Sequence, residues 1–195
     1  YDWDYHGQTG YSWWVERMRH TMEQTHLVRI DHFRGFESFW SVPYGESTAK
    51  SGEWLPGPGN ALFEALQSAL GSLPIVAEDL GVITPEVDKL RHDHELPGMV
   101  VLQFEVGNPE FEFEAIEENS VCYTGTHDND TTVGWFRGSP DDIRSPEDIA
   151  QAQRSVLDLT GGCPEMVHID LVKAAFSTAA LLAIAPLQDF LGLGS

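Results

Sequence analysis

The sequence has few cysteines, few basic residues and no long apolar run. Its 195 residues include two cysteines and only 11 lysines and arginines, against 31 acidic residues, for a formal net charge of −20. Cys122 and Cys163 have neither metal-ligand nor disulfide-framework spacing, so we expect a reducing, cytoplasmic environment and interpret Cys122 as a small core residue. No segment is long and apolar enough for a membrane span. The negative charge argues against nucleic acid or an anionic membrane as a partner, whereas a neutral partner is compatible with it.

The chain is expected to be part of a larger domain. No charged and then apolar leader is visible, and the first residues, 1–5, are typical of the middle of a domain. The last residues, 191–195, end without a capping element. We therefore expect residues 1–195 to form one partial domain that is truncated at both ends.

Helices and strands are predicted to alternate along the chain. Trp14, Met18 and Met22 recur at helical spacing and predict a helix over residues 10–26 with Ser12 as its N-cap, followed by a strand over residues 27–31. Further strands are expected at residues 75–78, 99–104, 120–124 and 183–185, and further helices at residues 61–70, 84–95, 146–158 and 167–182. Residues 36–60 are predicted to form a long irregular connection of functional importance.

This alternation predicts an α/β protein with a parallel sheet and right-handed crossovers. About five strand–helix units are present, whereas a closed barrel needs eight. A flavodoxin-like open sheet is the alternative, but no glycine-rich phosphate loop follows any strand.

Three of the apolar runs lead into a carboxylate. Asp31 follows one run, Glu78 follows the next, and Asp128 lies in the polar loop after the third. Parallel barrels present catalytic groups at the carboxyl ends of their strands, so we expect these three side chains to converge. Such a convergent acidic site points to chemistry on a sugar.

Cleavage of a glycosidic bond with retention needs an ionised carboxylate nucleophile and a carboxylic acid about 5–5.5 Å from it. Arg29 and Asp31 are two residues apart and face the same side of a strand, which suits an ionised nucleophile. A purely structural Arg–Asp pair is the alternative. Only one of Glu78 and Asp79 can point into the site, and Asp79 is better suited to a helix N-cap.

The loop after the strand at residues 120–124 offers Asp128 to grip sugar hydroxyls and His127 as a neutral donor. A Ca²⁺ site that also uses Asp130 is a weaker alternative, because no EF-hand spacing follows, and we predict no metal. Trp40 and Trp54, on the long connection, are the best candidates for sugar platforms. His92 and His94 are expected on the surface.

These blocks together resemble the 4-α-glucanotransferases known as amylomaltases or disproportionating enzymes, glycoside hydrolase family 77 of the α-amylase clan. The resemblance covers nearly the whole chain, and its motifs lie at residues 1–3, 10–14, 29–36, 40–43, 77–81, 97–99, 124–132, 134–135 and 186–189. Residues 105–118 depart from the family's pattern.

The resemblance implies a glycosidase-type TIM (β/α)8 barrel, of which this chain would hold strands four to eight. It implies Asp31 as nucleophile, Glu78 as general acid and base, and Asp128 as transition-state stabiliser. Arg29 and His127 would contact sugar, and we add His32, Trp40 and Trp54 as substrate-binding residues.

The implied activity is transfer of an α-1,4-glucan segment to a new 4-hydroxyl group by double displacement, without a cofactor. The partner would be an α-1,4-glucan or malto-oligosaccharide, with the oligomeric state left open. An α-1,4-glucan hydrolase of the same clan and an inactive, glucan-binding fragment are the alternatives.

Overall fold

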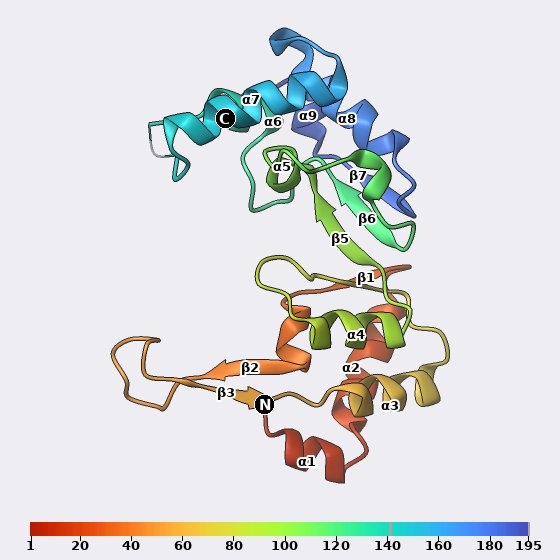
Figure 1. Cartoon of the computed structure of the whole chain (residues 1–195). Helices are drawn as coiled ribbons and strands as arrows, with labels where there is room; N and C mark the ends of the chain where they lie inside the picture. The colour runs from red at the N-terminus through yellow and green to blue at the C-terminus, as the bar shows by residue number, and fades with distance from the viewer. Residues whose placement is uncertain (141, 195) are drawn as a thin grey trace. The chain divides into compact units, whose positions relative to one another are not determined.

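The computed structural model describes residues 1–140 and 142–194. The chain divides into two compact units, which we call the first unit (Tyr1–Gly98) and the second unit (Met99–Ser195). Each unit combines short strands with several helices (Figure 1). Among the helices of the described residues, none has both the length and the hydropathy required to cross a bilayer.

The first unit is built around two parallel strands. Val28 of β1 lies opposite Ile75 of β4, and Ile30 lies opposite Ala77. The elements of this unit are α1 (Trp3–Gln8), α2 (Ser12–Met22), β1 (Val28–Ile30), the short 3-10 helix η1 (Phe33–Phe36), β2 (Ser38–Ser41), β3 (Glu53–Pro56), α3 (Asn60–Leu70), β4 (Ile75–Ala77) and α4 (Pro85–Asp93).

Helices α2, α3 and α4 cover one face of this two-stranded sheet (Figure 1). Ile75 and Ala77 of β4 pack into the same buried cluster as residues of these helices, including the fully buried Phe63. Side chains alternate along a strand, so Val76 and its register partner Arg29 point to the opposite face. Continuing this alternation beyond the strand ends directs Asp31 and Glu78 to that opposite face as well.

Two helix starts differ in detail from expectation. Tyr11, not Ser12, precedes α2; it lies in the left-handed region at φ 55° and makes no side-chain cap hydrogen bond. Ser12 therefore belongs to the helix itself. Thr84 precedes α4 with Pro85 in the first turn, as predicted, although the Thr84 side chain does not cap the helix. Proline suits this position because it has no N–H to leave unpaired.

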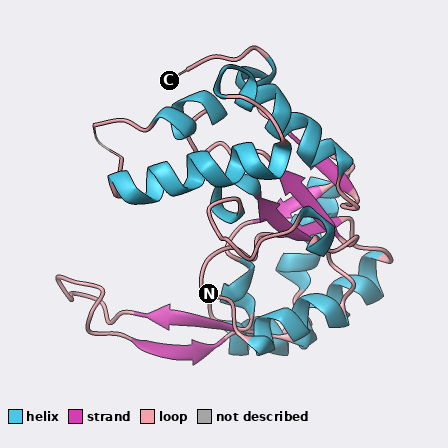
Figure 2. Cartoon of the chain, turned by 45° about the horizontal axis from the view of Figure 1, so that its top comes forward, coloured by secondary structure: helices cyan, strands magenta, loops and turns pink. Residues whose placement is uncertain are grey.

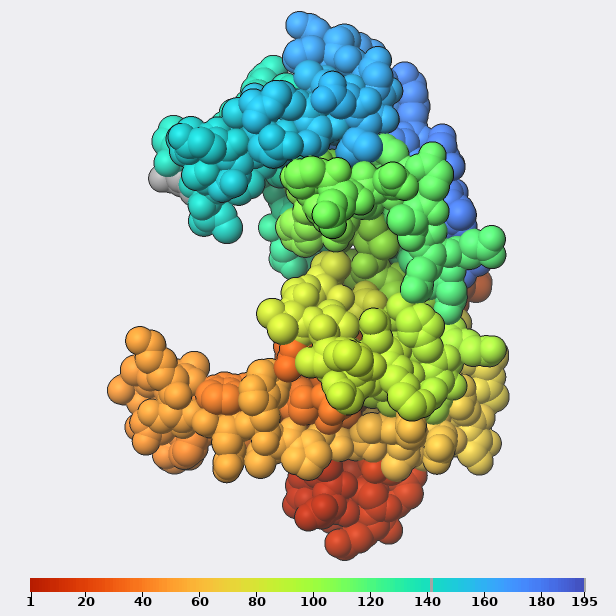
Figure 3. Space-filling model, viewed as in Figure 1, coloured from red at the N-terminus to blue at the C-terminus, as the bar shows by residue number. Residues whose placement is uncertain are grey.

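The expected irregular connection at residues 36–60 contains a β-hairpin, so that prediction was wrong. Strands β2 and β3 pair antiparallel, with Phe39 opposite Leu55 and Trp40 opposite Trp54. The hairpin extends away from the helices of the first unit as an arm (Figures 2 and 3). An 11-residue loop, residues 42–52, connects its two strands, so the sequence contains no tight-turn signal for a hairpin.

The second unit is built around the strands β5, β6 and β7, in that order across the sheet. Strands β6 and β7 are parallel, with Cys122 opposite Ala183. The elements here are β5 (Gly98–Val101), α5 (Leu102–Glu105), η2 (Phe113–Ala115), β6 (Ser120–Tyr123), α6 (Thr132–Arg137), α7 (Pro146–Thr160), η3 (Pro164–Met166), α8 (Val167–Ser177), β7 (Leu182–Ile184) and α9 (Leu187–Phe190).

The core of the second unit lies between this sheet and its helices. Cys122 is fully buried there with Val156 of α7 and Leu171 of α8. Burial raises the pKa of the Cys122 thiol to about 11. Its predicted role as a small core residue is therefore confirmed.

Two predicted elements of this unit are shorter than expected. The strand expected over residues 99–104 ends at Val101, because Leu102 and Val106 bury their side chains one helical turn apart. The helix expected over residues 167–182 ends at Ser177, where the Thr178 hydroxyl donates to the carbonyl oxygen of Ala175 at 2.9 Å. The predicted helix start at Pro146 is confirmed, with a capping box between Ser145 and Asp148.

His94 is buried, so its predicted surface position was wrong. Its side chain is only 8% exposed and packs on the Phe63 ring at a centroid distance of 5.2 Å. The two ring nitrogens lie 3.2 Å from Gln67 Oε1 and 3.1 Å from Asn60 Oδ1. Burial lowers the pKa of His94, and the carboxylates of Asp93 and Glu64 offset part of this effect.

The lowered pKa predicts a loss of stability in mild acid. Because the pKa of His94 is lowered in the folded protein, the unfolded chain binds this proton more tightly. The contribution of the neutral His94 side chain to stability is therefore fully present above about pH 6.5. It is lost as the pH falls towards the pKa that His94 has in the folded protein. We expect His94→Gln to reduce the dependence of the urea midpoint on pH in this range. His20→Gln, at an exposed position on α2, controls for the loss of one histidine. A midpoint difference between wild type and His94→Gln that does not vary with pH would contradict this prediction.

Candidate active site

Glu78 is held at the carboxyl end of β4 by the backbone that follows β1. Its carboxylate oxygen Oε2 accepts a hydrogen bond from the His32 amide at 2.6 Å, and Oε1 accepts one from the Leu80 amide at 3.0 Å. The Glu78 amide donates to the Ile30 carbonyl at 2.9 Å, and the Phe33 amide donates to the Glu78 carbonyl at 3.0 Å. The end of β4 is thus fastened to the residues on both sides of Asp31.

His32 takes a left-handed backbone conformation, with φ 50° and ψ 54°. Few residues other than glycine adopt this region, although asparagine, aspartate and histidine do so several times more often than the rest. At His32 the unusual conformation accompanies the turn from β1 into η1 and the amide hydrogen bond to Glu78. Backbone strain of this kind is found most often at functional sites.

Arg29 and Asp31 form an ion pair at the carboxyl end of β1. The distance from Arg29 Nη2 to Asp31 Oδ1 is 2.8 Å, so the predicted side-by-side placement is confirmed. Asp31 is largely exposed, which leaves its carboxylate accessible to a ligand. The catalytic roles of these residues stay predictions.

Asp79 forms a buried ion pair and does not cap a helix, so the N-cap interpretation was wrong. Asp79 Oδ2 lies 3.1 Å from Arg91 Nε of α4, and the two side chains are only 11% and 5% exposed. The Asp79 carboxylate also lies so close to Gly98 that a Cβ atom there would overlap it. Asp79 thus faces the helices while the neighbouring Glu78 faces away, as alternation along a strand requires.

A cavity of about 580 Å³ opens in the first unit beside Asp31. Aromatic rings and apolar side chains form much of its wall, and Arg29, Asp31 and His32 contribute the polar groups. The aromatic lining comes from Tyr1, Trp3, Trp14, Phe36 and Phe39. A mainly apolar cavity with a few grouped polar side chains is the usual form of a small-molecule site.

Trp40 and Trp54 lie together on the β2–β3 hairpin. Their ring centroids are 5.5 Å apart with the ring planes at 67°, and both rings are substantially exposed. Arg34 lies over the Trp54 ring at 4.3 Å, and Trp40 Nε1 donates to the Ala49 carbonyl at 2.7 Å. These contacts orient both rings while leaving surface free for a ligand.

Asp128 and His127 lie at the exposed tip of the loop between β6 and α6 in the second unit. His127 Nε2 is 3.4 Å from Asp128 Oδ2. Asn129 Oδ1 accepts hydrogen bonds from the amide and the hydroxyl of Thr126 at 2.9 and 2.7 Å, which fixes the turn at the tip. Asp128 and the pair Asp31 and Glu78 belong to different units, so the convergence of the three carboxylates stays a prediction.

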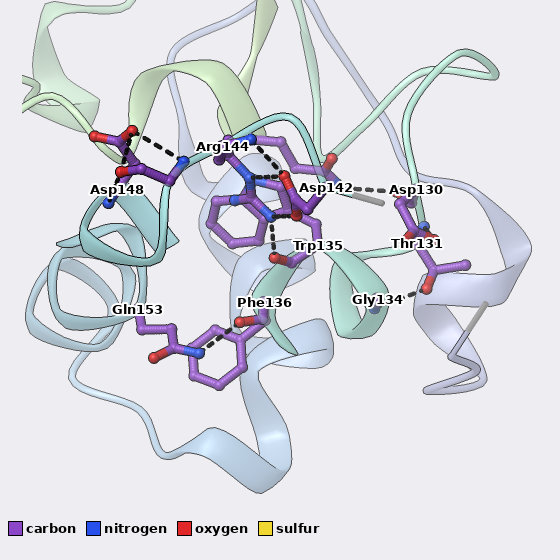
Figure 4. A network of polar contacts seen from close by, with 11 residues as sticks. Asp130, Thr131, Gly134, Trp135, Phe136, Asp142, Arg144, Asp148 and Gln153 are labelled. Carbon is purple, nitrogen blue, oxygen red and sulfur yellow. Dashed lines mark hydrogen bonds and ion pairs between the residues drawn. The ribbon is translucent and has the colours of Figure 1, made fainter. Parts of the chain in front are cut away.

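Helix α6, which follows this loop, is fixed at both ends (Figure 4). At its start the Thr131 hydroxyl accepts a hydrogen bond from the Gly134 amide at 3.1 Å. At its end Arg144 Nη2 donates to the Trp135 carbonyl at 2.5 Å, and the same guanidinium binds both carboxylate oxygens of Asp142. These hydrogen bonds from Arg144 lower the pKa of Asp142 to about 2.

Metal ligation has little support in this arrangement. Within residues 1–140 and 142–194, no three or more histidine, cysteine, aspartate and glutamate side chains are grouped as a metal site would require. The Asp130 carboxylate instead accepts a hydrogen bond from the Thr131 amide at 2.7 Å.

The burial of Arg91 and Asp189 was not predicted from the sequence, because no local pattern distinguishes a buried charged side chain from an exposed one.

Comparison with known proteins gives matches that cover all or nearly all of the chain. All of its residues, 1–195, match the model of the 4-alpha-glucanotransferase family, glycoside hydrolase 77. A 4-alpha-glucanotransferase of Synechocystis sp. is 53% identical over 201 residues, which cover 100% of this chain and 38% of that protein. A 4-alpha-glucanotransferase of Thermus thermophilus is 44% identical, over 100% of this chain and 39% of that protein. The chain therefore spans about two fifths of the length of these relatives.

Two solved structures of amylomaltases also match the chain. The amylomaltase from Streptococcus agalactiae in complex with acarbose matches with a TM-score of 0.85 and 30% identity, over 100% of this chain and 38% of that one. The amylomaltase from Corynebacterium glutamicum matches with a TM-score of 0.77 and 20% identity, over 94% and 31% of the two chains. The second likeness concerns the fold alone.

The buried pair of Asp79 and Arg91 predicts a large effect on stability. Arg91→Met removes the positive charge beside the Asp79 carboxylate, which is only 11% exposed, so we expect a loss of about 3–5 kcal/mol in the free energy of unfolding. Arg19→Met, which removes the exposed pair with Glu16, is the matched control and is expected to cost less than about 1 kcal/mol. Urea unfolding monitored by circular dichroism measures both values.

A double variant separates the ion pair from general packing damage. Asp79→Asn combined with Arg91→Met removes both charges, so we expect it to recover part of the stability lost in Arg91→Met. Equal losses in Arg91→Met and Arg19→Met would show that the buried pair has no special weight.

Proposed function

Because the chain belongs to the 4-alpha-glucanotransferase family, glycoside hydrolase 77, we propose that the protein containing it transfers segments of α-1,4-glucans to new 4-hydroxyl groups. The observation that carries this proposal is the fastening of the Glu78 carboxylate to the His32 amide. It joins the ends of two neighbouring parallel strands, each followed by a carboxylic acid, beside a cavity rich in aromatic rings. Paired carboxylates of this kind are what retaining chemistry at a glycosidic bond requires.

The proposed reaction has two displacements. Asp31 attacks the anomeric carbon, the bond to the leaving glucan oxygen breaks, and Glu78 donates its proton to that oxygen. The 4-hydroxyl group of an acceptor sugar then loses its proton to Glu78, and its oxygen displaces Asp31 from the anomeric carbon. Asp128 stabilises the positive charge that develops on the sugar ring, with Arg29, His32 and His127 binding its hydroxyl groups.

We propose that the two units are parts of one (β/α)8 barrel, in which β1, β4, β5, β6 and β7 are strands four to eight. Hydrogen bonding from the Ala77 amide of β4 to the carbonyl of Pro97, just before β5, supports this order. Exposed apolar residues just before β7, along it and after it support burial against further strands. They are Leu181, Leu182, Ile184, Leu187, Phe190 and Leu191.

The proposed substrates are α-1,4-glucans and malto-oligosaccharides. The Streptococcus agalactiae amylomaltase was solved with acarbose bound. All of this chain matches part of that fold. Trp40 and Trp54 offer exposed rings against which the apolar faces of sugars can stack. Transfer prevails over hydrolysis when the acceptor position holds sugar and excludes water, and we assign this task to the hairpin.

A product assay tests the activity. The intact protein that contains this chain is expected to convert maltotriose into glucose and longer oligosaccharides. Asp31→Asn and Glu78→Gln are each expected to lower the rate by at least about a thousandfold, because each variant removes one partner of the double displacement. Chromatography of the products measures both the rate and the product pattern.

The alternatives predict different products. A hydrolase would yield only products shorter than maltotriose. A protein that merely binds glucan would retain binding in Asp31→Asn and show no turnover as wild type. Either result would reject the proposed transferase activity.

The hairpin predicts a change in the ratio of transfer to hydrolysis. Trp54→Ala removes an exposed ring that we assign to the acceptor, so we expect the KM for acceptor sugar to rise about threefold to tenfold and hydrolysis to increase. Trp13→Ala on α2 is the matched control, since Trp13 is 48% exposed and Trp54 is 50% exposed. Equal effects of the two substitutions on the KM for acceptor sugar would show that the hairpin does not form part of the acceptor site.

A further inference from the structure

Asp189, in α9, is a buried carboxylate that no step of the proposed reaction uses. Its side chain is 1% exposed. Oδ2 accepts hydrogen bonds from the Thr124 and Thr132 hydroxyls at 2.6 and 2.9 Å, and Oδ1 accepts one from the Thr132 amide at 2.7 Å. All three donors are uncharged, although a buried carboxylate is costly unless its hydrogen bonds are complete.

The donors to Asp189 lie at the two ends of one loop. Thr124 directly follows β6, and Thr132 is the first residue of α6. Both threonines are fully buried. The loop between them carries His127 and Asp128 at its exposed tip. A single carboxylate therefore fixes the distance between the two ends of the segment that presents Asp128.

Further hydrogen bonds make this loop a connected unit from its base to its tip. Gln103 Nε2 donates to the Asp130 carbonyl at 3.0 Å, and the Gln103 amide donates to the Thr124 carbonyl at 3.3 Å. The Thr126 hydroxyl accepts from the Asp128 amide at 3.2 Å. These hydrogen bonds connect the base of the loop with the backbone around Asp128.

We propose that Asp189 is a positioning residue that sets the place of Asp128 through Thr124 and Thr132. This inference rests on the proposed role of Asp128 in the transfer reaction. Well-packed apolar side chains commonly stabilise a core as well as a buried charge does, so stability alone is a poor reason for a carboxylate here. A carboxylate with two oxygens is well suited to hold two separate backbone segments in a fixed geometry.

The test uses threonine variants that preserve the shape of the core. Thr124→Val replaces the hydroxyl by a methyl group of similar size, and Thr124→Ser retains the hydroxyl. Thr160→Val is the matched control in the same unit, because within the described part of the chain the Thr160 hydroxyl bonds only to the Val156 carbonyl of its own helix α7. All variants are made in the intact protein that contains this chain.

The main readout is kcat per active site with maltotriose. Active sites are counted by covalent labelling with a fluorinated α-glucosyl fluoride, which corrects for any fraction that fails to fold. We expect Thr124→Val to lower kcat roughly tenfold or more with KM changed less than about twofold, because small displacements of a catalytic group are costly. Thr124→Ser and Thr160→Val are expected to keep kcat within about twofold of wild type.

Combination with Asp128→Asn decides whether Thr124 acts through Asp128. If it does, Thr124→Val has no further effect on kcat in the Asp128→Asn background. An unchanged kcat per labelled site in Thr124→Val, or an equal fall in both backgrounds, would overturn the positioning inference alone. A wild-type kcat in Asp128→Asn would instead reject the proposed role of Asp128 and the inference with it.

Discussion

The parallel pairing of β1 with β4 is the constraint on which the first half of the candidate site depends. Its register sets Ile30 opposite Ala77, so the next residues, Asp31 and Glu78, leave the sheet side by side. The hydrogen bond from the His32 amide to the Glu78 carboxylate then fastens the two strand ends together. A shift of either strand by one residue would turn its own carboxylate towards the helices, because side chains alternate along a strand.

Two carboxylates of the candidate site, Glu78 and Asp128, each have a second and more deeply buried carboxylate close by. Asp79 follows Glu78 and is paired with Arg91, and Asp189 holds both ends of the loop that carries Asp128. Asp79 and Asp189 both have polar partners, whereas Asp31 and Asp128 are largely exposed. This division suits a site whose reactive groups must be free to meet a ligand and yet have little freedom to move.

Helix and strand periodicity predicted most elements that carry a regular apolar pattern, including the strands that end near Asp31 and Glu78 and the helix start at Pro146. The β2–β3 hairpin could not be predicted, because Trp40 and Trp54 pair across a long connection without a tight-turn signal. The end of β5 at Val101 was missed because a short apolar run fits a strand or a buried helix equally well. His94 looked like a surface residue because its burial arises from Phe63, Gln67 and Asn60, which are distant in the sequence.

By itself the sequence determined the family, the alternation of strands and helices, and which acidic residues follow apolar strands, because these properties depend on local order along the chain. Only the tertiary structure decided which carboxylates are exposed and which are buried. In the sequence Asp79 and Asp189 cannot be distinguished from Glu78 and Asp128. Arg91 contacts Asp79, and Thr124 and Thr132 contact Asp189, only once the chain has folded. Burial and hydrogen bonding depend on neighbours in space, and no spacing along the sequence supplies them.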